Sequence, residues 1–174
     1  MKRHLILVGL PGAGKTTVGR LAAADLDAPF LDLDDVIELS AGKSIARLFA
    51  DQGEAAFRTL EREAMERALA GAPSVIAAGG GWVAQPGNLE AVAGRAVVVY
   101  LQVTPQVAAR RVLPTANRRP LLEGGDVAGR MSQLLVARRS AYQRCEATVP
   151  ADSDQPRSVA REVVNLARSL AGWY

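Results

Sequence analysis

Short apolar segments alternate with longer amphipathic segments along this chain. The apolar segments are nearly continuous rather than alternating, which is typical of strands buried on both faces of a parallel sheet. The five predicted strands cover residues 5–8, 30–33, 75–78, 96–101 and 147–150. This order of elements predicts an α/β fold of three layers, α/β/α, in which a mostly parallel five-stranded sheet carries helices on both faces.

Helical spacing and end signals mark the segments between these strands. For example, apolar residues recur every three or four positions after Glu54, and that segment ends at Gly71. The predicted helices cover residues 17–26, 54–70, a segment opened by Thr104 and Pro105, 127–145, and a last segment capped by Ser158. In such sheets, ligands bind beyond the carboxyl ends of the strands, so the residues that follow each strand are the candidates for chemistry.

Composition narrows the class of protein. The chain has 174 residues, 49% of them hydrophobic and 22% charged, which suits one globular domain. It contains no apolar run of about 20 residues, and its first strand begins at once, so we expect neither a membrane span nor a signal peptide. The single cysteine, Cys145, excludes an internal disulfide and fits a reducing compartment. We therefore expect a cytoplasmic protein.

The net charge of +3 does not indicate nucleic-acid binding. The arginines are scattered and aromatic residues make up only 5% of the chain, so the pattern of a nucleic-acid surface is missing. The basic residues instead suit small anionic ligands such as phosphates and carboxylates.

Residues 9–16 read GLPGAGKT and fit the phosphate-binding P-loop pattern between a strand and a helix. Its glycines let backbone N–H groups point inward, and the helix that follows presents its positive end to the same place. Lys15 can reach the outer phosphates, and the Thr16 hydroxyl can bind magnesium. We expect ATP to contact Gly12, Ala13, Gly14, Lys15, Thr16 and Thr17.

Carboxylates follow the second predicted strand directly. Alternation along a strand places Asp32 and Asp34 on the same face, near its end. Beside a P-loop, this favours one carboxylate for the surroundings of a magnesium ion and one for a substrate hydroxyl. The alternative is that Asp34 or Asp35 caps a helix starting at Val36. We assign the chemistry to Asp34 and the cap to Asp35.

Three consecutive glycines, Gly79 to Gly81, follow the third predicted strand. Because glycine costs chain entropy, a run of three favours a place where a ligand approaches the backbone closely, although a flexible turn would use the same residues. No acidic residue ends this strand, so the usual Walker B aspartate is missing there. Asp32 is the nearest residue that could replace it.

Several arginines lie where they could bind anions. Arg58 and Glu61 lie three residues apart on a predicted helix, so they form either an ordinary surface ion pair or a unit in which Glu61 orients Arg58 toward a carboxylate. Residues 113–125 contain Arg118 and Arg119 and lack periodicity, which is typical of a mobile lid. A lid arginine could neutralise charge on a transferred phosphoryl group.

In chain order, these motifs resemble the shikimate kinase family over almost the whole chain. The resemblance rests on GLPGAGKT at 9–16, FLDLD at 30–34, GEAAFR with Glu61 at 53–61, GGG at 79–81, RPLL at 119–122, and Arg138 with Tyr142. It implies a P-loop NTPase fold like that of the nucleoside monophosphate kinases. It also implies transfer of the ATP γ-phosphoryl group to the 3-hydroxyl of shikimate, a step toward chorismate and the aromatic amino acids.

The resemblance implies roles for single residues at the acceptor. Asp34 would act on the shikimate hydroxyls as the base or as the group that orients them. Arg58 and Arg138 would hold the shikimate carboxylate. The glycine run would contact the ring substituents through Gly79, Gly80 and Gly81.

On the nucleotide side, the resemblance implies a Mg²⁺ cofactor bound directly by Thr16 and through water by Asp32. Lys15 and Arg119 would complete the catalytic set with Asp34. Arg110 or Arg111 would lie against the adenine, and Gln155 would make a further ATP contact. The spacing from these arginines to the lid is one residue longer than the family suggests, which leaves the choice between Arg110 and Arg111 open. We take Arg111, and we take Arg119 over its neighbour Arg118.

The sequence thus predicts a single kinase domain over residues 1–174, with a lid at about 112–125 and a substrate-binding region at about 34–61. We expect a monomer that acts on ATP and shikimate, without a nucleic-acid or membrane partner. One alternative is a kinase of another small polyhydroxy acid, such as gluconate, or of a nucleoside monophosphate. A second is a non-catalytic nucleotide-dependent switch, although the Asn-Lys-x-Asp motif that selects guanine is absent.

Overall fold

The computed structural model describes residues 1–114 and 125–174. In these residues, five strands form one sheet in the order β2-β3-β1-β4-β5, and every neighbouring pair is parallel. The strands are β1 (His4–Val8), β2 (Phe30–Asp32), β3 (Val75–Ala77), β4 (Ala96–Gln102) and β5 (Ala147–Pro150). The helices are α1 (Lys15–Asp25), α2 (Leu33–Ala41), α3 (Ile45–Leu69), η1 (Trp82–Ala84), α4 (Asn88–Val92), α5 (Pro105–Val112), α6 (Val127–Tyr142) and α7 (Pro156–Leu170).

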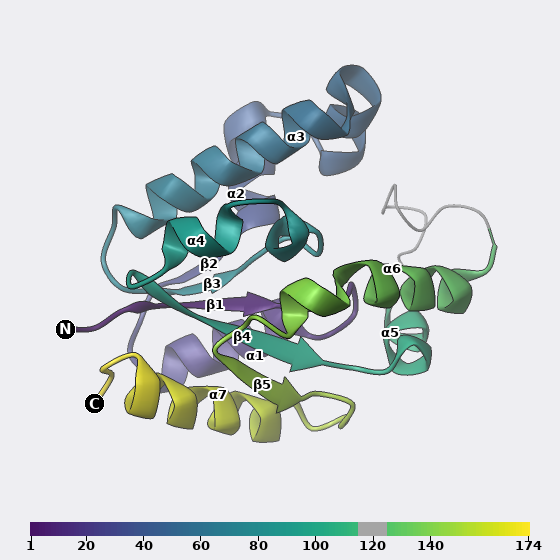
Figure 1. The fold of residues 1–174 in the computed structure, drawn as a ribbon. Coiled ribbons are helices and arrows are strands. Elements are labelled where there is room, and N and C mark those ends of the chain that lie inside the picture. The colour runs from purple at the N-terminus through teal and green to yellow at the C-terminus, as the bar shows by residue number, and fades with distance from the viewer. Residues whose placement is uncertain (115–124) are drawn as a thin grey trace.

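Helices cover both faces of the sheet (Figure 1). Helices α1 and α7 lie on one face, and α2, α3 and α4 lie on the other (Figure 1). Helix α5 follows the carboxyl end of β4, whereas both chain termini lie at the opposite end of the molecule (Figure 1). This arrangement confirms the predicted three-layer fold with a five-stranded parallel sheet. It also places all the strand-to-helix turns that carry the predicted site residues at one edge.

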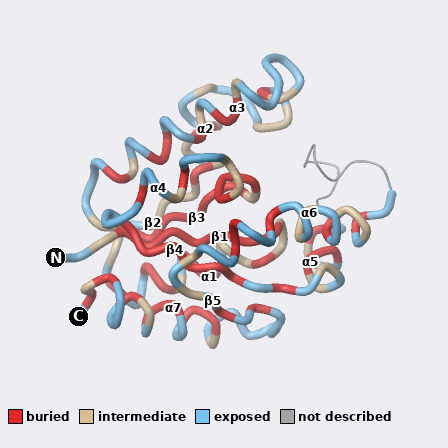
Figure 2. Tube along the Cα trace, in the orientation of Figure 1, coloured by how far each residue is buried: buried red, intermediate tan, exposed pale blue. Residues whose placement is uncertain are grey.

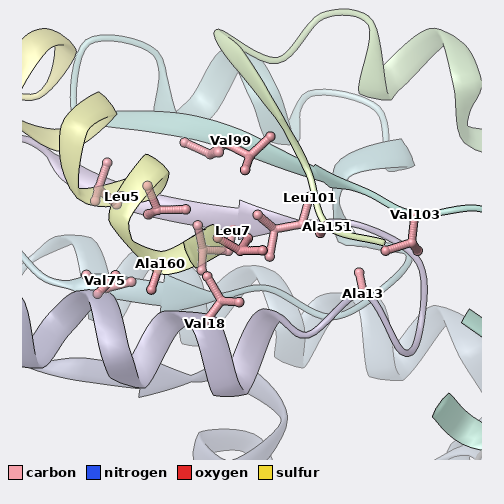
Figure 3. Packing of buried hydrophobic residues seen from close by; sticks show 14 of the residues in the cluster. Leu5, Leu7, Ala13, Val18, Val75, Val99, Leu101, Val103, Ala151 and Ala160 are labelled. Atoms are coloured by element: carbon pink, nitrogen blue, oxygen red, sulfur yellow. The ribbon is translucent and has the colours of Figure 1, made fainter. Parts of the chain in front are cut away.

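Alternate residues of each central strand enter two separate cores. Leu5 and Leu7 of β1 face α1 and α7, where they pack with residues such as Val18 and Ala160 (Figure 3). Ile6 and Val8 face the opposite core, beneath α2 and α3. The central strands β1 and β3 are buried throughout and β4 is buried up to Leu101, whereas the edge strands β2 and β5 are partly exposed, as are the outer faces of the helices (Figure 2). Burial on both faces explains why these strands are continuously apolar.

The second strand is shorter than predicted, and α2 begins earlier. The strand ends at Asp32, whose carboxylate Oδ1 accepts a hydrogen bond from the Asp34 N–H at 3.1 Å. Asp32 is therefore the N-cap of α2, and the predictions that Asp35 is the cap and that the helix starts at Val36 are wrong. Asp34 lies in the first helical turn instead of on the strand. A carboxylate satisfies a free N–H wherever the helix begins, and three aspartates here offered that choice.

Other helix ends also differ from the predictions. Helix α7 starts at Pro156 with Gln155 as its N-cap, so the predicted cap Ser158 lies inside the helix. Helix α3 starts at Ile45, where the Ser44 hydroxyl accepts from the Arg47 N–H. Gly53 interrupts α3 with φ 79° and ψ 174°, so the start predicted at residue 54 is where the helix resumes. The short elements η1 and α4 were not predicted.

No helix within the described ranges combines the length and apolar character needed to cross a membrane.

Candidate active site

The P-loop connects β1 to α1 and has the backbone that its glycines predict. Gly12 and Gly14 have φ of 82° and 92°, values that side chains with a Cβ disfavour. At Gly12 a Cβ would lie 2.6 Å from the Ala108 carbonyl oxygen of α5, so the position also requires close approach of two backbones. Lys15 is the first residue of α1, and its Nζ donates to the carbonyl oxygens of Gly9 at 2.9 Å and Leu10 at 3.1 Å.

Thr16 and Asp32 meet directly across two elements. The Thr16 hydroxyl donates to Asp32 Oδ2 at 2.6 Å. A hydroxyl that donates its proton to a carboxylate keeps its lone pairs for a cation, and hydroxyl and carboxylate oxygens are the hard ligands that Mg²⁺ prefers. Magnesium at phosphate sites typically takes one or two protein oxygens and completes its shell with phosphates and water. The residues present therefore fit this ion.

The three glycines after β3 are packed against charged side chains. A Cβ at Gly79 would lie 2.3 Å from Glu61 Oε1 and 3.3 Å from Asp34 Oδ1. At Gly80 it would lie 3.2 Å from Arg138 Nη1, and at Gly81 2.4 Å from Arg58 Nη2. The glycine run therefore has a steric cause beyond a flexible turn. It brings α2, α3 and α6 together by leaving room for their charged groups.

Arg58 and Glu61 form a buried ion pair rather than a surface one. Arg58 Nη1 donates to Glu61 Oε2 at 2.8 Å, and Nη2 donates to Glu54 Oε1 at 3.1 Å. Glu61 is fully buried and Arg58 is 9% exposed. Burial raises the pKa of the Glu61 carboxyl, the Arg58 guanidinium opposes that rise, and Asp34 adds to it. Such a pair holds the guanidinium in a fixed orientation, as bidentate binding of a carboxylate requires.

A cavity of about 400 Å³ extends from the P-loop to the glycine run. The residues that line it are Pro11, Gly12, Gly14, Lys15, Thr16, Thr17, Asp32, Asp34, Ala77, Ala78, Gly79, Gly80 and Arg111. Arg58, Gly81 and Arg138 are not part of this lining, but Arg138 packs against Gly80, which is. One cavity thus joins the predicted phosphate site to the predicted acceptor base.

A second cavity of about 210 Å³ lies beside the P-loop, between α1, α5 and the segment after β5. Its lining includes Thr17, Arg111, Ser153 and Asp154. Arg111 Nη1 donates to the Ala151 carbonyl oxygen at 2.9 Å, and Nη2 donates to that of Ser153 at 3.0 Å. The two cavities share Gly14, Thr17 and Arg111 in their linings.

Of the two candidate arginines on α5, the structure places Arg111 at these cavities. Arg110 instead pairs with Asp154 at 3.1 Å, with both side chains exposed. Gln155 follows Asp154 but is not among the lining residues, and its side chain makes no capping contact with α7. Arg118 and Arg119 lie outside the described residues.

The family model described as shikimate kinase matches residues 11–168 of this chain. A shikimate kinase from Symbiobacterium thermophilum is 40% identical over 163 residues, which cover 92% of this chain and 94% of that protein. The chain belongs to the shikimate kinase family. A solved shikimate kinase from Acinetobacter baumannii, in complex with shikimate, is 32% identical to this chain. The alignment covers 98% of this chain and 96% of that one, and the two structures superpose with a TM-score of 0.91.

The shikimate kinase family consists of ATP-dependent kinases, so the chain is an enzyme of that class. A gluconokinase from Sinorhizobium meliloti also superposes, with a TM-score of 0.62 and 18% identity, covering 98% of this chain and 94% of its own. That likeness concerns the fold alone. The gluconate-like alternative is therefore not favoured.

Sequence reasoning missed parts of this shikimate kinase site. The segment that follows β5 lines the second cavity through Ala151, Ser153 and Asp154, but only Gln155 was predicted there. The rule that ligands bind after the strands would have indicated the whole segment. Pro11 lines the first cavity and lies 3.5 Å from a Cβ at Gly80. No sequence signal distinguishes that proline from an ordinary P-loop residue.

Proposed function

We propose that this chain transfers the γ-phosphoryl group of ATP to the 3-hydroxyl of shikimate and releases ADP and shikimate 3-phosphate. The observation that carries the proposal is the meeting of Asp34, Arg58 and Arg138 at the glycine run, next to the P-loop cavity. A carboxylate and two guanidinium groups suit an acceptor that has both a hydroxyl and a carboxylate.

Different residues bind the acceptor, accept its proton and hold the phosphates. Arg58, oriented by Glu61, and Arg138 hold the substrate carboxylate. Asp34 orients the 3-hydroxyl and accepts its proton as the oxygen attacks the γ-phosphorus. The bond from that phosphorus to the bridging oxygen of ADP breaks in line with the attack. The backbone N–H groups of the P-loop and Lys15 hold the phosphates in position for this step.

Thr16 and Asp32 would hold the magnesium ion, Thr16 directly and Asp32 through water. When bound, the ion supplies positive charge that balances the phosphate oxygens of ATP. The 2.6 Å hydrogen bond between the Thr16 hydroxyl and the Asp32 carboxylate holds both oxygens next to each other on the wall of the cavity. Arg111, which lines both cavities, would contact the adenine, while Arg119 and Gln155 stay predicted ATP contacts.

The reaction is tested by measuring ADP release from ATP and magnesium, with and without shikimate, and with quinate and gluconate as controls. We expect strong stimulation by shikimate alone, loss of that stimulation when magnesium is chelated, and a product that carries phosphate on the 3-oxygen by NMR. Stimulation by gluconate and not by shikimate would contradict the proposed acceptor. ATP binding without stimulation by any acceptor would contradict a kinase activity toward these acids and favour a nucleotide switch.

We further propose that residues 1–174 act as one kinase domain and as a monomer, with the acceptor bound by the region at 34–61. Light scattering coupled to gel filtration gives the mass of the particle in solution. A mass near the 18.4 kDa of one chain would support the monomer.

A further inference from the structure

Arg138 occupies a core position on α6. The side chains of this helix that turn inward follow helical spacing at Met131, Leu135, Arg138 and Tyr142, and Arg138 is only 5% exposed. Its Nη1 lies near Gly80, yet it is buried without a hydrogen-bond partner among the described residues. An arginine in an apolar stripe is costly unless something compensates its charge.

The two arginines of the site are compensated differently. Arg58 is paired with the carboxylates of Glu61 and Glu54. In the described ranges, no ion pair within 4.0 Å involves Arg138. Glu61 attracts Arg138 through space only, so Arg138 keeps more of its charge for a ligand, but no directly paired carboxylate holds its guanidinium in place.

Tyr142 lies one turn further along the same face of α6. It is 2% exposed, and its ring stacks on Tyr100 of β4 with centroids 4.1 Å apart and planes 8° from parallel. Its hydroxyl is buried and, among the described residues, has no hydrogen-bond partner. Burial raises the pKa of this phenol, while the nearby Arg138 guanidinium acts in the opposite direction. A rigid ring thus presents a buried polar atom close to the Arg138 guanidinium, whose Nη1 has no hydrogen-bond partner among the described residues.

We propose that Tyr142 is a positioning residue for Arg138. Its hydroxyl oxygen accepts a hydrogen bond from the guanidinium when Arg138 binds the substrate carboxylate, and the stack on Tyr100 fixes the ring that carries this oxygen. A neutral acceptor suits this task better than a carboxylate, because it orients the guanidinium without cancelling the charge that the substrate needs. The inference rests on the proposed function and extends it to a residue that does not touch the substrate.

The first test is Tyr142→Phe, which removes only the hydroxyl and keeps the ring in the stack. We expect the KM for shikimate to rise about tenfold, with kcat, the KM for ATP and the unfolding midpoint unchanged. The matched control is Tyr100→Phe, which removes the same atom from the other ring of the stack and should leave the KM for shikimate unchanged. A Tyr142→Phe enzyme with unchanged KM, or with kcat and unfolding midpoint lowered together, would overturn the inference.

The second test is a double-mutant cycle with Arg138→Ala. If Tyr142 acts through Arg138, adding Tyr142→Phe to Arg138→Ala lowers kcat/KM for shikimate no further, a ratio obtained from the linear range without saturation. Effects that multiply would overturn the inference. Wild-type activity toward shikimate, measured in parallel, distinguishes a failure of this inference from a failure of the proposed function. An active wild type with independent effects contradicts only the role of Tyr142, whereas a wild type inactive toward shikimate contradicts the proposed function and this inference with it.

Discussion

At the scale of single residues, the site is built from charged side chains that the fold has removed from water. Glu61 is fully buried, and Arg58 and Arg138 are nearly so. Removing a charge from water costs several kcal/mol unless a partner or a ligand offsets it. The Arg58–Glu61 pair offsets its own cost, whereas a bound carboxylate would offset that of Arg138. Buried charges of this kind are common at functional sites.

Asp34→Asn tests the proton acceptor. The amide cannot accept the hydroxyl proton, so we expect kcat to fall about 100-fold or more, while the dissociation constant for ATP stays unchanged. The matched control is Asp35→Asn at the adjacent, exposed carboxylate, which should keep wild-type turnover. Turnover by steady-state kinetics and ATP affinity by calorimetry check both parts. Near-normal turnover of Asp34→Asn would contradict the role given to Asp34.

Arg58→Ala tests the carboxylate clamp. We expect the KM for shikimate to rise about tenfold or more, because a charge-assisted contact is lost, and the KM for ATP to stay nearly unchanged. The variant should still fold, because burial already raises the pKa of Glu61, so this carboxyl can take up a proton once its partner is gone. Arg62→Ala, on the exposed face of the same helix, is the control. An unaltered KM for shikimate in Arg58→Ala would argue against the clamp.

At the scale of elements, the turn from β3 to η1 organises the acceptor side of the site. Its three glycines lie against side chains from α2, α3 and α6, all within 3.4 Å of where a Cβ would be. None of the three has a φ in the left-handed region. What the turn requires of these residues is therefore space for other elements and not an unusual backbone.

Gly81→Ala tests whether Gly81 is needed because it leaves space for Arg58 or because of its backbone conformation. Gly81 has φ −99°, which alanine adopts without strain, but its Cβ would lie 2.4 Å from Arg58 Nη2. We expect the arginine to be displaced and the KM for shikimate to rise several-fold, with the KM for ATP unchanged. The control is Gly71→Ala after α3, where the nearest atom to a Cβ is 3.4 Å away. Equal shikimate KM values in Gly81→Ala and wild type would refute this steric account.

At the scale of the whole molecule, the candidate active site lies at the carboxyl ends of the strands, and the opposite end of the sheet contributes to stability. His4 opens β1 at the edge opposite the P-loop and is 5% exposed. Its Nδ1 accepts from the Ser74 N–H at 3.2 Å, joining β1 to the segment before β3. Burial lowers the pKa of His4 from 6.5, and Arg95 lowers it further. The folded chain therefore favours the neutral ring.

This pKa shift predicts that stability depends on pH. Below about pH 6.5 the unfolded chain binds a proton that folded His4 resists, so the stabilisation present above that pH is lost as pH falls toward the folded pKa. We expect the unfolding midpoint to drop between pH 7.5 and 5.5, by about 2–4 °C for each kcal/mol lost. His4→Asn keeps an acceptor for Ser74 but does not titrate, so its midpoint should fall less. Parallel pH profiles of the two proteins would rule out His4 as the cause.

The sequence by itself determined the sheet, the layers and the P-loop. Nearly continuous apolar segments of four to six residues are typical of strands covered on both faces, and the P-loop signal consists of adjacent residues whose geometry is local. The interiors of the helices were also predicted from local patterns, because the spacing of apolar residues in 54–70 and 127–145 indicates which face of each helix is buried. The predicted starts of helices were wrong where several side chains able to cap a helix lie close together, as at Asp32 to Asp35.

Only the tertiary structure decided which distant residues meet. Arg58 of α3 and Arg138 of α6 reach the same glycine turn because the strand order places β3 beside β1, and no local pattern encodes that order. The choice of Arg111 over Arg110 depends on how α5 is rotated, since each residue turns a helix by about 100°. Glu61 is buried because the glycine turn closes over it. The chain thus carries the chemistry in its residue types, and packing between segments far apart in sequence assembles them into one site.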